Sequence, residues 1–194
     1  MILYYPVSSK PSLPSLIGEK IKLWSIIMKN TSMRRKNTAL FLTRGAVIAA
    51  MYVALSYISG LMGLASGVIQ FRISEALTIL PLLFPEAVLG VTIGCLISNL
   101  TMASAVWDII FGTLATFIGA VGTLLMRRLP RRIKWLATLP PILANAIIIP
   151  FVLLYAYGIE GGYFYFMLTV GIGEIVCAGI GGSLLYYSLE KISF

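Results

Sequence analysis

The chain has 194 residues, of which 59% are hydrophobic and only 11% are charged, and its mean hydropathy is +0.94. A soluble domain carries about 25% charged residues, so the composition excludes an ordinary soluble protein and indicates an integral membrane protein of one compact bundle. Long apolar runs favour an all-α membrane protein over a barrel, whose strands alternate at every second residue.

The net charge of +8 comes from two basic clusters. Most Lys and Arg residues lie before the first apolar run or in one short loop: Lys10, Lys20, Lys22, Lys29, Arg34, Arg35, Lys36 and Arg44, then Arg127, Arg128, Arg131, Arg132 and Lys134. Basic residues placed in this way mark the cytoplasmic side of a membrane protein. A nucleic-acid-binding patch is the weaker alternative, because no soluble domain carries it.

Residues 1–42 differ from the rest of the chain. Pro6, Pro11 and Pro14 predict a poorly ordered start, and 16–29 has the composition of a basic amphipathic helix on a membrane surface. Met33 would make a natural translation start, so we expect residues 1–32 to be a dispensable extension. We expect a basic extension over 1–42, partly disordered or interfacial, before a membrane domain over 43–194.

Apolar segments then predict a bundle of six transmembrane helices. Their expected bounds are 43–60, 74–84, 87–102, 107–126, 136–157 and 164–189. The second segment is short for a crossing that needs about 20 residues, so we expect it to begin earlier or to lie in a protein-lined environment. With six crossings, both termini and both basic clusters fall on the cytoplasmic side of the cell membrane.

Polar residues recur in and beside these segments, where a charge costs about 2.5–3.5 kcal/mol at the centre of a helix. They are Arg72, Glu75, Asn99, Asp108, Asn145 and Glu174. At a rise of about 1.5 Å per residue, Asn145 and Glu174 lie about 14–15 Å into their segments, near the midplane, and the others lie in the outer half. We expect one polar pocket that opens outward, with its floor near the midplane.

Several of these residues also have a purely structural interpretation. Arg72 and Glu75 are three residues apart and can neutralise each other on one helix. Asn99 and Asn145 can hydrogen-bond between membrane helices, and Asp108 can cap a helix at the interface. Both interpretations stay open for each residue.

The remaining carboxylates differ in their location. Glu174 is hardest to explain without a function, because an unpaired carboxylate in the middle of a membrane segment is costly. Glu86 and Glu160 fall in loops, where we expect them to be solvated.

Two of the predicted helices carry small residues at helical spacing. On the first they are Ala46, Ala50 and Ala54. This stripe lets another helix approach closely, either from a partner or from within the bundle. On the fourth they are Gly112, Ala115, Gly119 and Gly122, and we expect these to pack inside the bundle.

The sequence lacks the residues of familiar catalytic sites. It contains no His and no P-loop motif, so it provides neither a Ser-His-Asp triad nor a P-loop ATPase. Cys95 and Cys177 lie in apolar segments, where we expect buried thiols. We therefore expect no enzymatic activity, no cofactor and no metal site, and instead a binding subunit that takes its energy from a partner.

Five runs of sequence resemble the queuosine-precursor transporter (QueT) family. They are VIQFRISEALT (68–78), IGCLISNL (93–100), WDIIFGTLAT (107–116), PILANA (141–146) and GE (173–174). The resemblance implies a substrate-binding S component of an energy-coupling-factor (ECF) transporter, with six membrane helices and cytoplasmic termini. Such a component docks on a module of one transmembrane protein and two ATPases, and Ala46, Ala50 and Ala54 match the family's docking motif.

The ligand that the resemblance implies is a 7-deazaguanine such as preQ1, preQ0 or queuine. Carboxylates suit its adjacent N–H donors, amides suit its ring carbonyl, and aromatic rings can stack on it. The expected site residues are Gln70, Phe71, Arg72, Glu75, Asn99, Trp107, Asp108, Phe111, Asn145 and Glu174. A second carboxylate favours preQ1, which carries an aminomethyl cation.

Three other functions stay open. The first is an S component for a different vitamin, and the second is a self-sufficient secondary transporter in which Glu174 carries a coupling proton. The third is a membrane scaffold without a ligand. Ligand-binding assays, the ATP dependence of transport and replacement of the polar residues by Ala or Leu separate them.

Overall fold

The computed structural model describes residues 13–64, 70–102, 106–155, 158 and 161–193. The chain divides into two units, Met1–Phe41 and Leu42–Phe194. Helix α1 (Leu13–Leu61) begins in the first unit and includes the residues expected to form a helix over 16–29. Of the three prolines on which a poorly ordered start was expected, Pro14 lies in α1, whereas Pro6 and Pro11 lie outside the described residues. The later part of the 60–67 connection and the end of the fifth segment at 157 also lie outside them.

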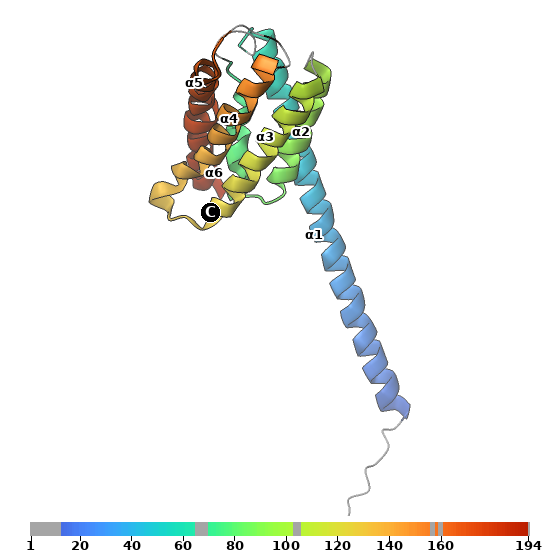
Figure 1. Cartoon of the computed structure of the whole chain (residues 1–194). Coiled ribbons are helices and arrows are strands. Elements are labelled where there is room, and N and C mark those ends of the chain that lie inside the picture. The colour runs from blue at the N-terminus through green and yellow to red at the C-terminus, as the bar shows by residue number, and fades with distance from the viewer. Residues whose placement is uncertain (1–12, 65–69, 103–105, 156–157, 159–160, 194) are drawn as a thin grey trace, which may run out of the picture. The chain divides into compact units, whose positions relative to one another are not determined.

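In the second unit, helical elements are joined by short connections (Figure 1). After α1 come η1 (Ile73–Leu82), α2 (Ala87–Met102), α3 (Val106–Leu125), η2 (Met126–Arg128), η3 (Arg131–Thr138), α4 (Leu139–Tyr155), α5 (Tyr163–Glu174), η4 (Ile175–Gly181) and α6 (Gly182–Ser193). The segments 37–61, 106–128, 131–155 and 163–191 are long and apolar enough to span a membrane, while η1 and α2 are shorter apolar helices. The all-α class is confirmed, and the six-crossing topology with cytoplasmic termini stays a prediction.

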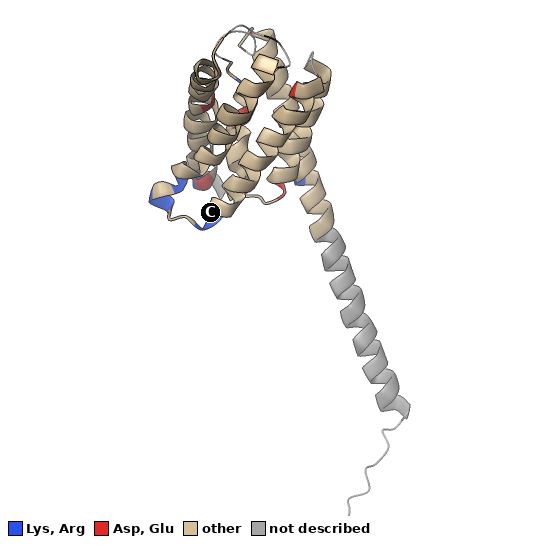
Figure 2. Ribbon diagram, in the orientation of Figure 1, with Lys and Arg blue, Asp and Glu red and all other residues tan. Residues whose placement is uncertain are grey.

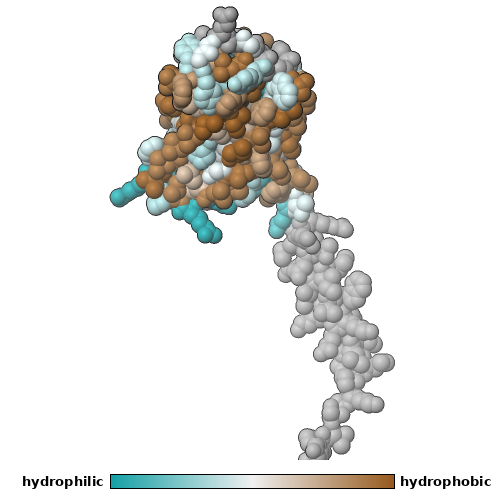
Figure 3. Space-filling view, in the orientation of Figure 1, coloured by the Kyte–Doolittle hydropathy of each residue, from teal (hydrophilic) through white to brown (hydrophobic). Residues whose placement is uncertain are grey.

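Apolar side chains cover much of the visible face of the bundle (Figure 3). Leu89, Leu143, Leu168 and Leu184, from four different helices, each expose half or more of their surface. A surface of this kind is stable in hydrocarbon and not in water, where contiguous apolar patches of more than a few hundred Å² are rare. The protein is therefore a multi-pass membrane protein.

Most Lys and Arg residues of the second unit gather at one end (Figure 2). Two of them form ion pairs: Arg131 Nε lies 3.0 Å from Glu190 Oε2, and Arg44 Nη1 lies 3.4 Å from Glu86 Oε1. Glu86 is 5% exposed, so the expectation of a solvated carboxylate is wrong. Arg44 of α1 provides the opposite charge that allows this burial. Glu160 lies outside the described residues.

The short second segment, η1, is a 3₁₀ helix enclosed by other helices. Its residues from Leu77 to Leu82 are all buried, and it packs against α2, α3, α6 and η4. The expectation of a protein-lined environment is thus confirmed. A 3₁₀ helix rises about 2.0 Å per residue against about 1.5 Å for an α-helix, so η1 reaches about 20 Å. This geometry lets a short segment traverse much of the bundle.

Small residues allow the helices of the bundle to approach closely. A Cβ on Gly94 of α2 would lie 2.7 Å from Tyr52 Cβ on α1, and a Cβ on Gly119 of α3 would lie 2.6 Å from Pro141 Cα on α4. Ala115 of α3 is fully buried. The small residues of α3 therefore pack inside the bundle, as the sequence predicted.

The two faces of α1 differ in the second unit. Ile48, Tyr52 and Ser56 are buried against the other helices. The residues Ala46, Ala50 and Ala54 are all exposed. Internal packing within the described bundle therefore does not account for this alanine stripe.

Candidate functional site

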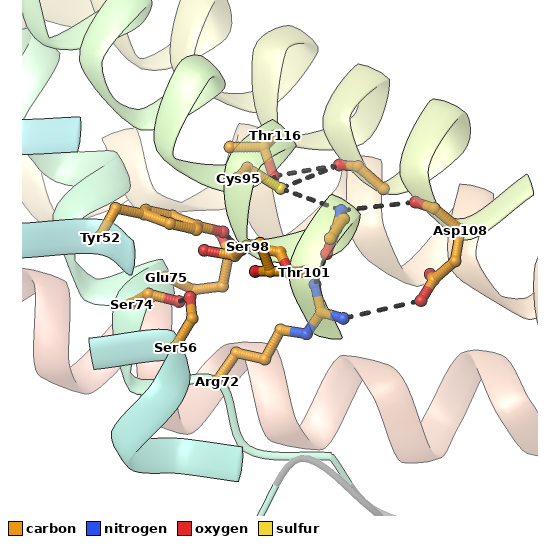
Figure 4. A network of polar contacts seen from close by, with 12 residues as sticks. Tyr52, Ser56, Arg72, Ser74, Glu75, Cys95, Ser98, Thr101, Asp108 and Thr116 are labelled. Carbon is orange, nitrogen blue, oxygen red and sulfur yellow. Dashed lines mark hydrogen bonds and ion pairs between the residues drawn. The ribbon is translucent and has the colours of Figure 1, made fainter. Parts of the chain in front are cut away.

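Arg72 lies at the entrance to η1 and connects it to two other helices (Figure 4). Its Nη1 donates a hydrogen bond to Asn99 Oδ1 of α2 at 3.1 Å, and its Nη2 lies 3.9 Å from Asp108 Oδ2 in the first turn of α3. The side chains of Arg72 and Asp108 are 29% and 14% exposed. The structure thus brings together three expected site residues from three helical segments.

Asn99 continues this network toward the interior. Its Nδ2 donates to the backbone oxygen of Asp108 and to Cys95 Sγ, both at 3.4 Å, and Thr116 Oγ1 donates to the same sulfur at 3.2 Å. A Cβ on Gly112 would lie 2.8 Å from Asn99 Nδ2, so glycine leaves room for the amide. Asn99 therefore links α2 to α3 by a hydrogen bond, which is the structural role that the sequence allowed for it.

Glu75 is buried and hydrogen-bonded to a tyrosine of α1. The hydroxyl of Tyr52 donates to Glu75 Oε1, and the two residues are 0% and 2% exposed respectively. Arg72 is an electrostatic neighbour of Glu75, although its hydrogen bond and ion pair go to other helices. Within the described part of the chain, Glu75 Oε2 has no hydrogen-bond partner.

Glu174 lies where the α-helical turns of α5 give way to the wider turns of the π-helix η4. It is 8% exposed, and Asn145 of α4 is 5% exposed. Asn145, Glu75 and Arg72 are its polar and charged neighbours. Among the residues that the structure describes, neither Glu174 Oε2 nor Asn145 Nδ2 has a hydrogen-bond partner.

Gln70 reaches the same region through its backbone. A Cβ on Gly173 would lie 2.0 Å from the carbonyl oxygen of Gln70, so only glycine fits there without displacing the chain. This contact holds the segment that leads to Arg72 beside the end of α5. Gln70 and Phe71 are both partly buried, and the backbone nitrogen of Phe71 donates to Leu64 O at 2.8 Å.

Trp107 and Phe111 form an aromatic pair on α3. They are 57% and 37% exposed, and their rings stack on each other with centroids 6.0 Å apart at an interplanar angle of 25°. These two expected site residues are thus exposed on α3, whereas Glu75 and Glu174 are buried.

Three polar residues on the inner face of α1 were not predicted from the sequence. Tyr52, Ser56 and Ser59 are all buried, and each contributes to a hydrogen bond with residues at the start of η1. Their spacing of four and then three residues places them on one face of a helix. That spacing within an otherwise apolar segment is the signal that would have found them.

The unpaired atoms determine what the site can bind. Glu75 and Glu174 each present an acceptor oxygen, and Asn145 presents a donor. A buried polar atom without a partner costs about 1–3 kcal/mol, and native proteins contain few of them. Their presence on three neighbouring segments suits a small polar molecule with N–H donors and a carbonyl acceptor.

Comparisons with known proteins identify similar sequences. Residues 42–191 match the model of the QueT transporter family. The curated "Queuosine precursor transporter QueT" of Lactococcus lactis subsp. cremoris (strain MG1363) is 39% identical over 92 residues, which are 46% of this chain and 53% of the relative. The match thus spans about half the length of the curated relative. No solved structure matches this chain.

Proposed function

Because this chain belongs to the QueT transporter family, we propose that it captures a queuosine precursor for import. The proposed ligand is a 7-deazaguanine such as preQ1, and the proposed machine is an ECF transporter, in which this chain is the S component. The name of the Lactococcus relative supports the substrate class. The protein is a multi-pass protein of the cell membrane.

One observation carries the proposal: three buried polar side chains, Asn145, Glu174 and Glu75, come from separate segments and interact around Glu174. Each of them keeps one polar atom without a hydrogen-bond partner among the described residues, a donor on Asn145 and an acceptor on each carboxylate. The hydrogen-bonding edge of a 7-deazaguanine offers matching groups: a ring carbonyl, a ring N–H and an amino group. Asn145 would donate to the carbonyl, Glu174 would accept from the ring N–H, and Glu75 would accept from the amino group.

Charge placement supports uptake from the outside. Asp108 and Arg127 are separated by a length of helix that corresponds to about 28 Å at 1.5 Å per residue, close to the hydrocarbon thickness of about 30 Å. If the basic end is cytoplasmic, the network of Asp108, Arg72 and Asn99 lies toward the exterior. Arg72 then stands between the outside and the deeper carboxylates.

The exposed alanine stripe of α1 supports a partner in the membrane. Small side chains let helix backbones approach closely, and they provide the close contact that drives association between helices in lipid. Ala46, Ala50 and Ala54 are exposed in the second unit and are available to a helix of the ECF module. This module would supply the ATP hydrolysis for which the sequence has no P-loop motif.

Calorimetric titration of the purified protein tests the ligand. We expect saturable binding of preQ1 and no heat of binding with riboflavin, biotin or folate. Binding of one of these vitamins instead would indicate an S component for another substrate. If no ligand binds and the polar residues tolerate replacement by Leu, the scaffold interpretation is correct.

A transport assay in proteoliposomes tests the source of energy. We expect preQ1 uptake only when the protein is reconstituted with an ECF module and ATP is present on the cytoplasmic side. Uptake by the protein alone, driven by an imposed proton gradient, would instead identify a secondary transporter.

A further inference from the structure

Three hydrogen bonds join the inner face of α1 to the first residues of η1, and Figure 4 shows the residues of two of them, Tyr52 with Glu75 and Ser56 with Ser74. They connect Tyr52 Oη to Glu75 Oε1, Ser56 Oγ to Ser74 Oγ (2.8 Å) and Ser59 Oγ to the backbone nitrogen of Ile73 (3.0 Å). We call these three contacts the α1–η1 clasp. The residue numbers rise along α1 and fall along η1 from one contact to the next, so the two segments are antiparallel here. Each successive turn of α1 hydrogen-bonds to one residue at the start of η1.

The last contact of the clasp fixes where η1 begins. The first backbone N–H groups of a helix have no partner within the helix. Arg72, the residue before η1, provides no side-chain cap, and Ser59 of α1 accepts the hydrogen bond of Ile73 instead. Ser59 is fully buried and donates its own proton to Leu55 O at 2.9 Å. The cap from α1 therefore sets the direction of the turn that carries Glu75.

The first contact of the clasp comes from a side chain with little freedom to move. Tyr52 is fully buried, and a Cβ on Gly94 of α2 would lie 2.7 Å from Tyr52 Cβ and 3.1 Å from its Cγ. The ring thus lies against the backbone of α2. A tyrosine fixed in this way holds its hydroxyl at one place beside Glu75.

Occupation of one carboxylate oxygen leaves the other for a ligand. Tyr52 donates to Glu75 Oε1, whereas Glu75 Oε2 is buried and has no hydrogen-bond partner among the described residues. We propose that Tyr52 is a positioning residue that determines specificity, because it aims Glu75 Oε2 at the 2-amino group of the ligand. This inference rests on the proposed function and adds a residue outside the expected ligand contacts.

The test compares two ligands that differ only at that group. The dissociation constants of preQ1 and of its analogue without the 2-amino group are measured by calorimetry for each variant. We expect the wild-type protein to bind preQ1 at least tenfold more tightly than the analogue. Tyr52→Phe, which removes one oxygen atom, should weaken preQ1 binding about tenfold and leave the analogue nearly unchanged, so that the ratio falls toward one.

A second buried tyrosine provides the matched control. Tyr186 is 2% exposed, and its hydroxyl donates to Glu190 Oε1 at 3.1 Å in α6. Tyr186→Phe makes the same chemical change and should leave both dissociation constants unchanged. Ser59→Ala removes the hydrogen bond that caps the first turn of η1 and leaves Tyr52 unchanged. It should also bring the dissociation constants of preQ1 and the analogue closer together. It is the test variant if Tyr52→Phe does not fold.

A double-mutant cycle separates positioning from general packing. Glu75→Gln should also lower the ratio between the dissociation constants of the analogue and preQ1. If Tyr52 acts through Glu75, adding Tyr52→Phe to Glu75→Gln should not lower that ratio further. Additive effects, or an unchanged ratio in Tyr52→Phe, overturn the inference. Wild-type protein that binds preQ1 without preferring it to the analogue overturns the inference alone, whereas wild-type protein that does not bind preQ1 overturns the proposed function as well.

Discussion

Arg72 Nη2 lies 3.9 Å from Asp108 Oδ2, so a single guanidinium spans from the entrance of η1 to the first turn of α3. The same group donates to Asn99 on α2. A hydrogen bond that involves a charged group contributes about 1.5–3 kcal/mol, more than a neutral one. These contacts join the entrance of η1 to both α2 and α3.

Replacement of Arg72 by Gln is expected to weaken both the fold and the binding of preQ1. Loss of the guanidinium removes the ion pair with Asp108 and the hydrogen bond to Asn99, so we expect about 1–3 kcal/mol of lost stability and a 10- to 100-fold higher dissociation constant. Thermal unfolding and calorimetry measure the two effects. Arg131→Gln removes an exposed ion pair with Glu190 and should change stability by less than about 1 kcal/mol.

Glu174→Gln should separate binding from stability. The amide cannot accept the same charge-assisted hydrogen bond from a ring N–H, so the preQ1 dissociation constant should rise at least tenfold. The unfolding temperature should stay equal or rise, because the substitution removes a buried carboxylate that lacks a full set of hydrogen-bond partners and is therefore costly to bury. Glu190→Gln in α6 serves as the control and should bind preQ1 normally. Normal binding by Glu174→Gln would remove Glu174 from the site.

Two glycines of α5 test whether the close contact with Gln70 matters. A Cβ on Gly173 would lie 2.0 Å from Gln70 O, whereas a Cβ on Gly171 would lie 3.8 Å from Ala146 Cβ, an ordinary contact. We expect Gly173→Ala to displace the segment before Arg72, with a loss of about 1–3 kcal/mol of stability and about tenfold of preQ1 affinity. Gly171→Ala should leave affinity unchanged, and equal effects of the two substitutions would contradict the prediction.

The alanine stripe of α1 should affect transport and not ligand binding. Ala50→Trp places a large ring on an exposed position of the second unit, where it would block the close approach of a partner helix. We expect unchanged preQ1 affinity together with loss of co-purification with the ECF module and of ATP-driven uptake. Leu168→Trp adds bulk at a position that is 62% exposed on α5 and should retain both. Retention of uptake by Ala50→Trp would rule out this face as the docking surface.

Much of the architecture follows from the distribution of apolar and basic residues. The six apolar segments appear as helices near their expected positions, because a lipid environment requires long runs of apolar residues whose backbone bonds are satisfied internally. The burial of the short second segment was one of the two expectations that followed from its length. The structure showed in addition that this segment is a 3₁₀ helix, which its apolar composition had not indicated.

The site was less accessible to sequence reasoning. Depth along each helix placed Asn145 and Glu174 at similar levels, and the structure makes them neighbours. Depth does not give the direction in which a side chain points around its helix. For this reason Trp107, next to Asp108 in the sequence, is largely exposed, and Tyr52, on the inner face of a distant helix, contacts Glu75.

The sequence by itself determined that the chain is a helical membrane protein with polar residues retained at a cost in its apolar segments. Only the tertiary structure decided which of those residues meet and which oxygen of Glu75 is left unpaired. The reason is physical: burial in lipid depends on composition summed along a segment, whereas a hydrogen bond depends on the rotation and packing of two segments far apart in the chain.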